Sequence, residues 1–113
     1  MKKALGKSTR IPDVTASELG TASQALLCGW TLAVLYALSQ HPQRFNELKA
    51  KLPDVPPRSI ARILKRLEVN GIVVRRVSPT RSPAVFYSIP AGSKVYEIAA
   101  AFHNWASREF SKH

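Results

Sequence analysis

The hydrophobic period of the chain changes abruptly at Asn70-Gly71, and this change restricts the fold more than any other feature. Over residues 58–69 the apolar side chains recur every three or four residues, which is typical of an amphipathic helix. The β-branched run of residues 72–77 predicts a strand, and residues 84–89 predict a returning strand after a proline-containing turn. Asn-Gly is a common helix terminator. The pattern therefore indicates a helix followed at once by a β-hairpin.

Helical patterns also precede and follow this unit. Residues 15–39 carry apolar side chains at helical spacing, and the Cys28-Gly29 step predicts that two helices meet there. A short helix is expected over residues 44–52, Pro57 suits the first position of the next helix, and a last helix is expected over residues 93–110. We therefore predict an α+β, mainly α fold: a winged helix-turn-helix with N- and C-terminal dimerisation helices.

The chain of 113 residues has room for one modest core. We expect residues 1–13 to form a basic flexible arm and residues 14–113 to form a single winged helix-turn-helix domain. Within that domain, residues 30–89 are the expected DNA-binding head and residues 93–110 the expected C-terminal dimerisation helix.

The charge of the chain points to a polyanionic partner. Seventeen Lys and Arg against seven Asp and Glu give a net charge of +10. Such an excess repels itself unless a polyanion offsets it, so nucleic acid is favoured and an anionic membrane surface comes second. No stretch approaches the roughly 20 apolar residues that span a bilayer, and no apolar run follows the N-terminal lysines. We expect no membrane partner and a cytoplasmic, nucleoid-associated protein.

The helix over residues 58–69 carries its positive charge on one face. At 100° per residue, Arg58, Arg62 and Lys65 fall within about 60° of one another, opposite the apolar side chains. Arg66 is expected on one flank of that face, and Ser59 at its other end. A helix fits the major groove of B-DNA, and arginine can bind guanine through two hydrogen bonds. The alternative is a basic face that is merely solvated.

The concentration of positive charge continues into the hairpin, which favours nucleic acid. Arg75 and Arg76 point to opposite faces of their strand, so at most one of them can follow the DNA backbone. Arg81 lies at the tip, where it can enter the minor groove or pair with a phosphate, or remain an exposed loop charge. The candidate DNA-binding residues are Arg44, Arg58, Ser59, Arg62, Lys65, Arg66, Arg75, Arg76 and Arg81.

Apolar stripes near the two ends of the chain indicate how two copies meet. The stripe on the last helix is too large for so small a core to bury alone, and the stripe on the first helix is its expected partner. The alternative is that Phe102 and Trp105 pack against their own domain. The candidate dimer-interface residues are Leu19, Leu26, Val95, Ile98, Phe102 and Trp105.

From Trp30 to Ile89 the sequence resembles the HxlR-type winged helix-turn-helix regulators, a branch of the MarR-like group. The matching segments include Trp30-Thr31-Leu32, Arg44-Phe45-Asn46-Glu47-Leu48, Asn70-Gly71-Ile72-Val73 and Tyr87-Ser88-Ile89. The resemblance implies a dimeric transcription factor that binds a near-palindromic operator, with the terminal helices making the dimer.

The chain also departs from the family pattern. His41 stands where the family usually has glycine, and Pro56 where it usually has serine. Many members carry a redox-sensing cysteine about ten residues before the tryptophan, whereas Cys28 lies two residues before Trp30, so that role does not transfer. We expect Cys28 to be a buried small residue rather than a sensor thiol.

The chemistry-bearing residues argue against several other classes. A single cysteine excludes an internal disulfide, and three widely separated histidines give no metal-ligand spacing, so no metal or cofactor is expected. No nucleophile–base pair or glycine-rich phosphate loop is present, which disfavours an enzyme. The alternatives left open are a nucleic-acid-binding protein without sequence preference, chromatin- or RNA-associated, and a protein-interaction module. The sequence does not reveal any small-molecule effector.

Overall fold

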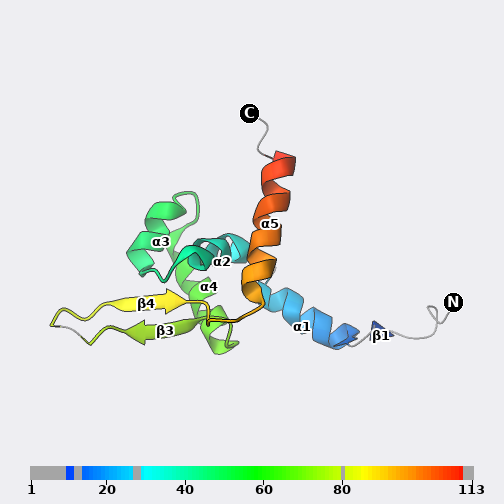
Figure 1. Cartoon of the computed structure of the whole chain (residues 1–113), viewed down its shortest axis with the longest axis horizontal. Helices are drawn as coiled ribbons and strands as arrows, with labels where there is room; N and C mark the ends of the chain where they lie inside the picture. Colours follow the sequence, from blue (N-terminus) through cyan, green and yellow to red (C-terminus); the bar gives the residue numbers. More distant parts are fainter. Residues whose placement is uncertain (1–9, 12–13, 27–28, 80, 111–113) are drawn as a thin grey trace.

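The helices and the long hairpin occur in the predicted order. The computed structural model describes residues 10–11, 14–26, 29–79 and 81–110. The elements are β1 (Arg10–Ile11), β2 (Val14–Thr15), α1 (Ala16–Leu26), α2 (Thr31–Gln40), α3 (Phe45–Lys51), α4 (Pro57–Val69), β3 (Val74–Val77), β4 (Val85–Ser88) and α5 (Val95–Phe110). Figure 1 shows α2, α3 and α4 gathered with the β3–β4 hairpin in one body, from which α1 and α5 extend in different directions.

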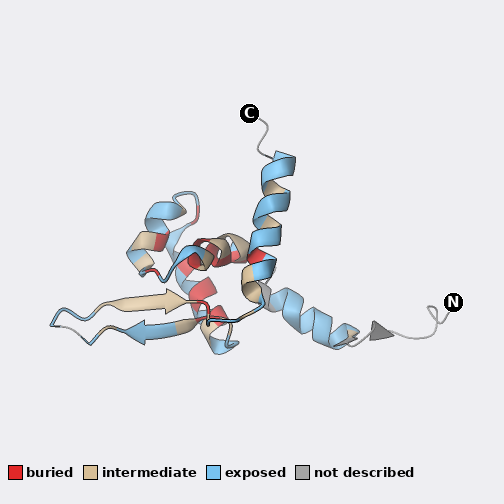
Figure 2. Ribbon diagram, in the orientation of Figure 1, coloured by how far each residue is buried: buried red, intermediate tan, exposed pale blue. Residues whose placement is uncertain are grey.

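The core forms where α2 meets α3 and α4. Val34, Leu35 and Leu38 of α2 are almost fully buried, as are Leu48 of α3 and Leu64 of α4. Figure 2 shows that the buried residues concentrate in this central region, while α1 and most of α5 are exposed. Burying a Leu or Ile side chain contributes about 1.5–3 kcal/mol, so this contact dominates the stability of the body.

The helix α4 turns its apolar side inward, as predicted. The residues Ile60, Ile63, Leu64 and Leu67 are all buried. Pro57 occupies the first helical position, where its missing N–H removes no helical hydrogen bond. The carbonyl of Pro56 accepts hydrogen bonds from the Ser59 and Ile60 N–H groups at 2.9 and 3.1 Å, which closes the first turn without a side-chain cap.

A glycine in the left-handed region ends α4 and sets the start of the hairpin. Gly71 has φ +74, and its N–H donates to the Glu68 carbonyl at 3.0 Å. The Ile72 N–H donates to the Leu67 carbonyl at 2.8 Å, which completes a Schellman motif. The predicted strand over 72–77 therefore begins two residues late, at Val74, because the N–H groups of residues 72 and 73 are directed to Leu67 instead.

The hairpin is joined to the core through Gln43. The Gln43 N–H donates to the Tyr87 carbonyl at 3.0 Å, and the Tyr87 N–H donates to the Gln43 carbonyl at 2.8 Å. This antiparallel bridge places Gln43 beside β4 of the β3–β4 sheet. The Gln43 side chain is fully buried, and its Nε2 donates to the Ala37 carbonyl of α2. The base of the hairpin is therefore held in a fixed position against the helices.

The register of the hairpin assigns its arginines to different faces. Arg75 pairs with Tyr87, and Arg76 pairs with Phe86. Directly paired residues share a face and successive residues alternate, so Arg75 and Arg76 lie on opposite faces, as the sequence predicts.

The N-terminal segment contains a pair of short strands that the sequence did not predict. Arg10–Ile11 pairs antiparallel with Val14–Thr15, so part of the expected flexible arm is a two-residue strand. The other residues of the arm, 1–9 and 12–13, lie outside the described residues. Thr15 and Glu18 cap α1 reciprocally: the Thr15 N–H donates to Glu18 Oε1 at 2.9 Å, and the Glu18 N–H donates to Thr15 Oγ1 at 3.1 Å.

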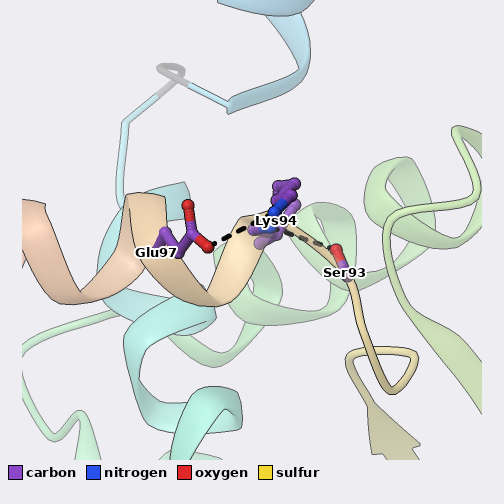
Figure 3. Close-up of polar contacts among 4 residues, drawn as sticks. Ser93, Lys94 and Glu97 are labelled. Atoms are coloured by element: carbon purple, nitrogen blue, oxygen red, sulfur yellow. Dashed lines mark hydrogen bonds and ion pairs between the residues drawn. The ribbon is translucent and has the colours of Figure 1, made fainter.

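The helix α5 is tied to the body at its first turns. The helix was expected to begin at Ser93, but it begins two residues later, at Val95. The Ser93 hydroxyl accepts a hydrogen bond from the Val95 N–H at 3.1 Å (Figure 3). The Tyr96 hydroxyl donates to the Ile89 carbonyl at 2.9 Å, just beyond β4. Further along, the His103 ring stacks on Tyr36 of α2 with 4.1 Å between ring centroids, and Ala99 is fully buried.

The Gly71→Ala substitution should lower the free energy of unfolding by about 1–3 kcal/mol, because a β-carbon strains the left-handed conformation. A β-carbon at this position would meet no atom within 4 Å, so steric contact contributes nothing. Urea denaturation followed by circular dichroism measures the effect. Gly20→Ala in the exposed α1 is the control, and it should be neutral or stabilising. Equal stability of the Gly71→Ala and wild-type chains would contradict this account of the α4 terminus.

Candidate nucleic-acid interface

The exposed side of α4 is a cationic surface. Arg58, Arg62 and Lys65 are exposed, on the side of the helix opposite its buried leucines and isoleucines. Ser59 and Arg66 are half-buried and line the same groove on one flank. The expectation that they lie at opposite ends of the face is wrong, because residues seven apart are almost two full turns apart on a helix. The structure thus brings together the five candidate residues that the sequence assigned to this helix.

A groove between α4 and the hairpin adds a sixth candidate residue to this surface. This wing-side groove has a volume of about 400 Å³ and is lined by Ala61, Lys65, Glu68, Arg75 and Tyr87. Lys65 of α4 and Arg75 of β3 therefore face the same space. Arg75, rather than Arg76, therefore lies on the face of the hairpin beside α4.

Arg76 and Arg44 lie elsewhere. Both are on the face of the hairpin that carries Phe86, since Arg76 pairs with Phe86 and the Arg44 guanidinium lies 5.9 Å from the Phe86 ring centroid. Arg44 directly precedes α3, and its backbone N–H donates to Glu47 Oε1 at 2.7 Å. These two candidate residues form a separate pair, away from the Arg75 face.

Arg81 is exposed in the tip that connects β3 to β4. A hydrogen bond of 2.7 Å from the Ser78 N–H to the Ala84 carbonyl closes the base of this tip. The tip extends beyond the last paired residues of the strands, Val77 and Val85. Figure 1 shows this tip at the end of the hairpin away from α4. Because Arg81 belongs to the tip, the paired strands β3 and β4 separate it from the α4 surface.

Among the described residues, no ion pair neutralises the charges of this surface. In residues 10–11, 14–26, 29–79 and 81–110, the one ion pair joins Lys94, just before α5, to Glu97 in its first turn at 3.6 Å (Figure 3). None of the candidate cations of α4 or the hairpin pairs with a carboxylate of that part of the chain. A surface of like charges lowers its energy when it meets an external anion.

A second groove follows the other flank of α4. This Trp30-side groove has a volume of about 180 Å³ and is lined by Gly29, Trp30, Ser59, Arg62, Ile63 and Arg66. The sequence counted Trp30 among the apolar residues of a helical stripe, yet the side chain is 45% exposed, just before α2. Tyr87 of the wing-side groove was likewise absent from the candidate residues. No motif in the sequence distinguishes these two aromatic residues from core residues.

The candidate dimer-interface residues divide into two groups. Ile98 and Trp105 are 41% and 50% exposed on α5, with Phe102 half-buried beside Trp105 at 6.4 Å between ring centroids. Leu19 of α1 is 40% exposed. Val95 differs from this group because it packs against the core of its own chain. The side chain of Leu26 and the whole of Cys28 lie outside the described residues.

The described residues contain neither a metal-ligand cluster nor a membrane-spanning helix. No three His, Cys, Asp or Glu side chains gather as metal ligands within the described part of the chain. No described helix has the length and apolar character needed to cross a membrane.

Comparisons with known proteins give one consistent result. A family model described as HxlR-like helix-turn-helix matches residues 26–113. The HTH-type transcriptional regulator YtfH of Escherichia coli (strain K12) is 35% identical over 77 residues, which are 67% of this chain and 61% of YtfH. The HTH-type transcriptional regulator YvaP of Bacillus subtilis (strain 168) is 32% identical over 79 residues, 69% of this chain and 73% of YvaP. The match thus spans less than two thirds of YtfH.

A solved structure extends the comparison to three dimensions. The crystal structure of diamide-treated YodB from B. subtilis matches with a TM-score of 0.70 and 26% sequence identity, over 84% of this chain and 95% of YodB. The predicted fold class, a mainly helical winged helix-turn-helix, is thereby confirmed. The relatives are named as regulators and not as enzymes.

Proposed function

This chain belongs to the HxlR-like helix-turn-helix family of transcriptional regulators, and on that premise we propose that it binds double-stranded DNA sequence-specifically as a homodimer. The observation that carries the proposal is the exposed face of α4, where Arg58, Arg62 and Lys65 lie together without carboxylate partners among the described residues. On the same premise, the protein acts in the cytoplasm on nucleoid DNA.

In this proposal, α4 enters the major groove and reads the bases. Along the axis of α4, Arg62 lies between Arg58 and Lys65 on the exposed face, so we assign it the contact with guanine O6 and N7. Arg58 lies in the first turn, and Lys65 one turn beyond Arg62. Their side chains hold bases or phosphates on either side of that contact.

The hairpin serves as the wing. Arg75 holds the DNA backbone beside α4, and Arg81 at the tip reaches a phosphate or the adjacent minor groove. Residues 30–89 thus act as the DNA-binding head, and residues 93–110 as the helix that pairs two heads.

The exposed apolar side chains of α5 support the homodimer. Ile98 and Trp105 are about half exposed on a helix that is docked to its own core only through its other side. Large apolar groups left in water favour association, and a second copy of the chain supplies a self-complementary surface, with Leu19 of α1 included. The dimer would set two α4 helices about 34 Å apart, one turn of DNA.

Selection of binding sites from random duplex DNA with the purified chain tests the function. A palindromic motif with half-sites about one turn apart is the expected result. Binding without enrichment of any motif would instead indicate a nucleic-acid-binding protein without sequence preference. Absence of salt-sensitive DNA binding would refute the proposal and favour a protein-interaction module.

The Arg62→Ala substitution should weaken binding to the selected operator by about 1–3 kcal/mol and relax the preference at one base pair of each half-site. Fluorescence-anisotropy titrations with the operator and with its single-base variants measure both effects. Arg108→Ala on the exposed α5 removes the same charge far from α4 and should leave affinity and preference unchanged. Equal behaviour of the two variants would exclude Arg62 from base recognition.

The Trp105→Glu substitution should convert the dimer to a monomer, because it places a charge in the centre of the proposed interface. Sedimentation velocity gives the assembly state, and circular dichroism verifies that the helices remain folded. The matched control is Val77→Glu on the wing, where an equally exposed apolar residue lies outside that interface. A Trp105→Glu chain that stays dimeric would show that α5 does not form the interface.

A further inference from the structure

We propose that the two grooves flanking α4 hold the two phosphate strands that border the major groove, with Trp30 and Tyr87 donating hydrogen bonds to phosphate oxygens. This inference rests on the proposed function and names the contacts by which the duplex is held on each side of the recognition helix. Neither aromatic residue was among the candidate DNA-binding residues.

The dimensions of helix and duplex require contact on both flanks. An α-helix with its side chains is about 10–12 Å across, and the major groove of B-DNA is about 12 Å wide. A helix that enters the groove therefore fills it, and each flank meets one of the sugar–phosphate strands that form the walls. The residues on the flanks then decide how firmly the backbone is held.

The angular positions of the residues on α4 separate the two flanks. Relative to the centre of the cationic face, Ser59 and Arg66 lie about 70–90° to one side, and Ala61 and Glu68 lie about 70–90° to the other. Ser59 and Arg66 line the Trp30-side groove, whereas Ala61 and Glu68 line the wing-side groove. The two grooves thus lie on opposite flanks of one helix, with Arg62 bordering one and Lys65 the other.

The Trp30-side groove has the chemistry of a phosphate seat. The Arg66 guanidinium and the Ser59 hydroxyl line it without a carboxylate, and Arg62, the proposed base-reading residue, borders it. The Trp30 indole N–H has no hydrogen-bond acceptor among the described residues, and the side chain is 45% exposed. An indole N–H is a donor only, so it suits an anion that offers several acceptor oxygens.

The wing-side groove offers a comparable set of donors. Lys65 and Arg75 supply two positive charges, and the Tyr87 hydroxyl has no partner in the described part of the chain. Tyr87 is fixed by the backbone bonds between it and Gln43, so its position relative to α4 is set by the core. A hydroxyl held in place donates to a phosphate oxygen with little loss of side-chain freedom.

Glu68 makes the wing-side groove testable by a gain of affinity. Its carboxylate lines the same space as Lys65 and Arg75, and it repels a phosphate held there. A single exposed charge contact changes affinity about 1.5- to 5-fold, so removal of this one opposing charge should have an effect of that size. A gain of affinity cannot arise from a misfolded variant.

The first experiment follows tryptophan emission. A duplex of random sequence is added to the wild-type chain and to the Trp30→Phe chain, whose remaining tryptophan is Trp105, and acrylamide quenching is measured before and after. We expect the duplex to protect the wild-type emission and to leave the emission of the variant unchanged. If the duplex binds and the two chains respond equally, the assignment of Trp30 is wrong. If no duplex binds either chain, it is the proposed function that fails.

The second experiment compares neighbouring arginines. Arg75→Ala and Tyr87→Phe should weaken the binding of every duplex, and Arg75→Ala should reduce the slope of log affinity against log salt by about one per subunit. Glu68→Gln should tighten the binding of every duplex about 1.5- to 5-fold. Arg76→Ala is the matched control, since Arg76 follows Arg75 in the same strand but lies on the opposite face. Equal effects at 75 and 76, or no gain from Glu68→Gln, would overturn the wing-side assignment.

Discussion

The burial of one side of α4 against α2 and α3 is the contact on which the rest of the structure depends. Four apolar side chains of α4 are buried, and at about 1.5–3 kcal/mol each they contribute as much as the whole net stability of a typical small domain. A rotation of the helix by one residue, 100°, would expose part of this set and bury arginine or lysine. The core therefore fixes the direction in which the cationic face points. The packing of the apolar side of α4 therefore determines which of its residues are available for recognition.

The position of the hairpin follows from the same core through two backbone devices. The Leu67 carbonyl accepts from residues 72 and 73, so the chain leaves α4 in one direction only. At the same end of the sheet, on the other strand, the Gln43–Tyr87 bridge and the Gln43–Ala37 side-chain bond fix β4 to the loop after α2. Because both strands are anchored, the position of Arg75 on β3 is fixed relative to Lys65 on α4. The groove between them is then a preorganised surface, which lowers the ordering that binding requires.

The parts of this architecture that depend on local patterns could be predicted from the sequence. The inward and outward faces of α4, the hairpin after Gly71 and the opposite orientations of Arg75 and Arg76 all follow from periods of 3.6 and 2 residues. The face of the hairpin that meets α4 could not be predicted, because it depends on the pairing of Gln43 with Tyr87, two residues far apart in the chain. Trp30 was missed because its residue type predicts the interior, whereas its place just before α2 leaves it half exposed. The β1–β2 pair was missed because two-residue strands have no measurable period.

The hairpin is fixed at its base and closed at its far end by a single backbone hydrogen bond, from Ser78 to Ala84. The described residues of this tip, 79 and 81–83, are exposed. An exposed loop tip is the kind of segment in which a chain tolerates insertions and deletions. One residue added to each strand would advance the tip by about 3.4 Å, which equals the rise of one base pair along a DNA strand. The reach of the wing can thus diverge in base-pair steps among related proteins while the recognition helix and its core remain unchanged.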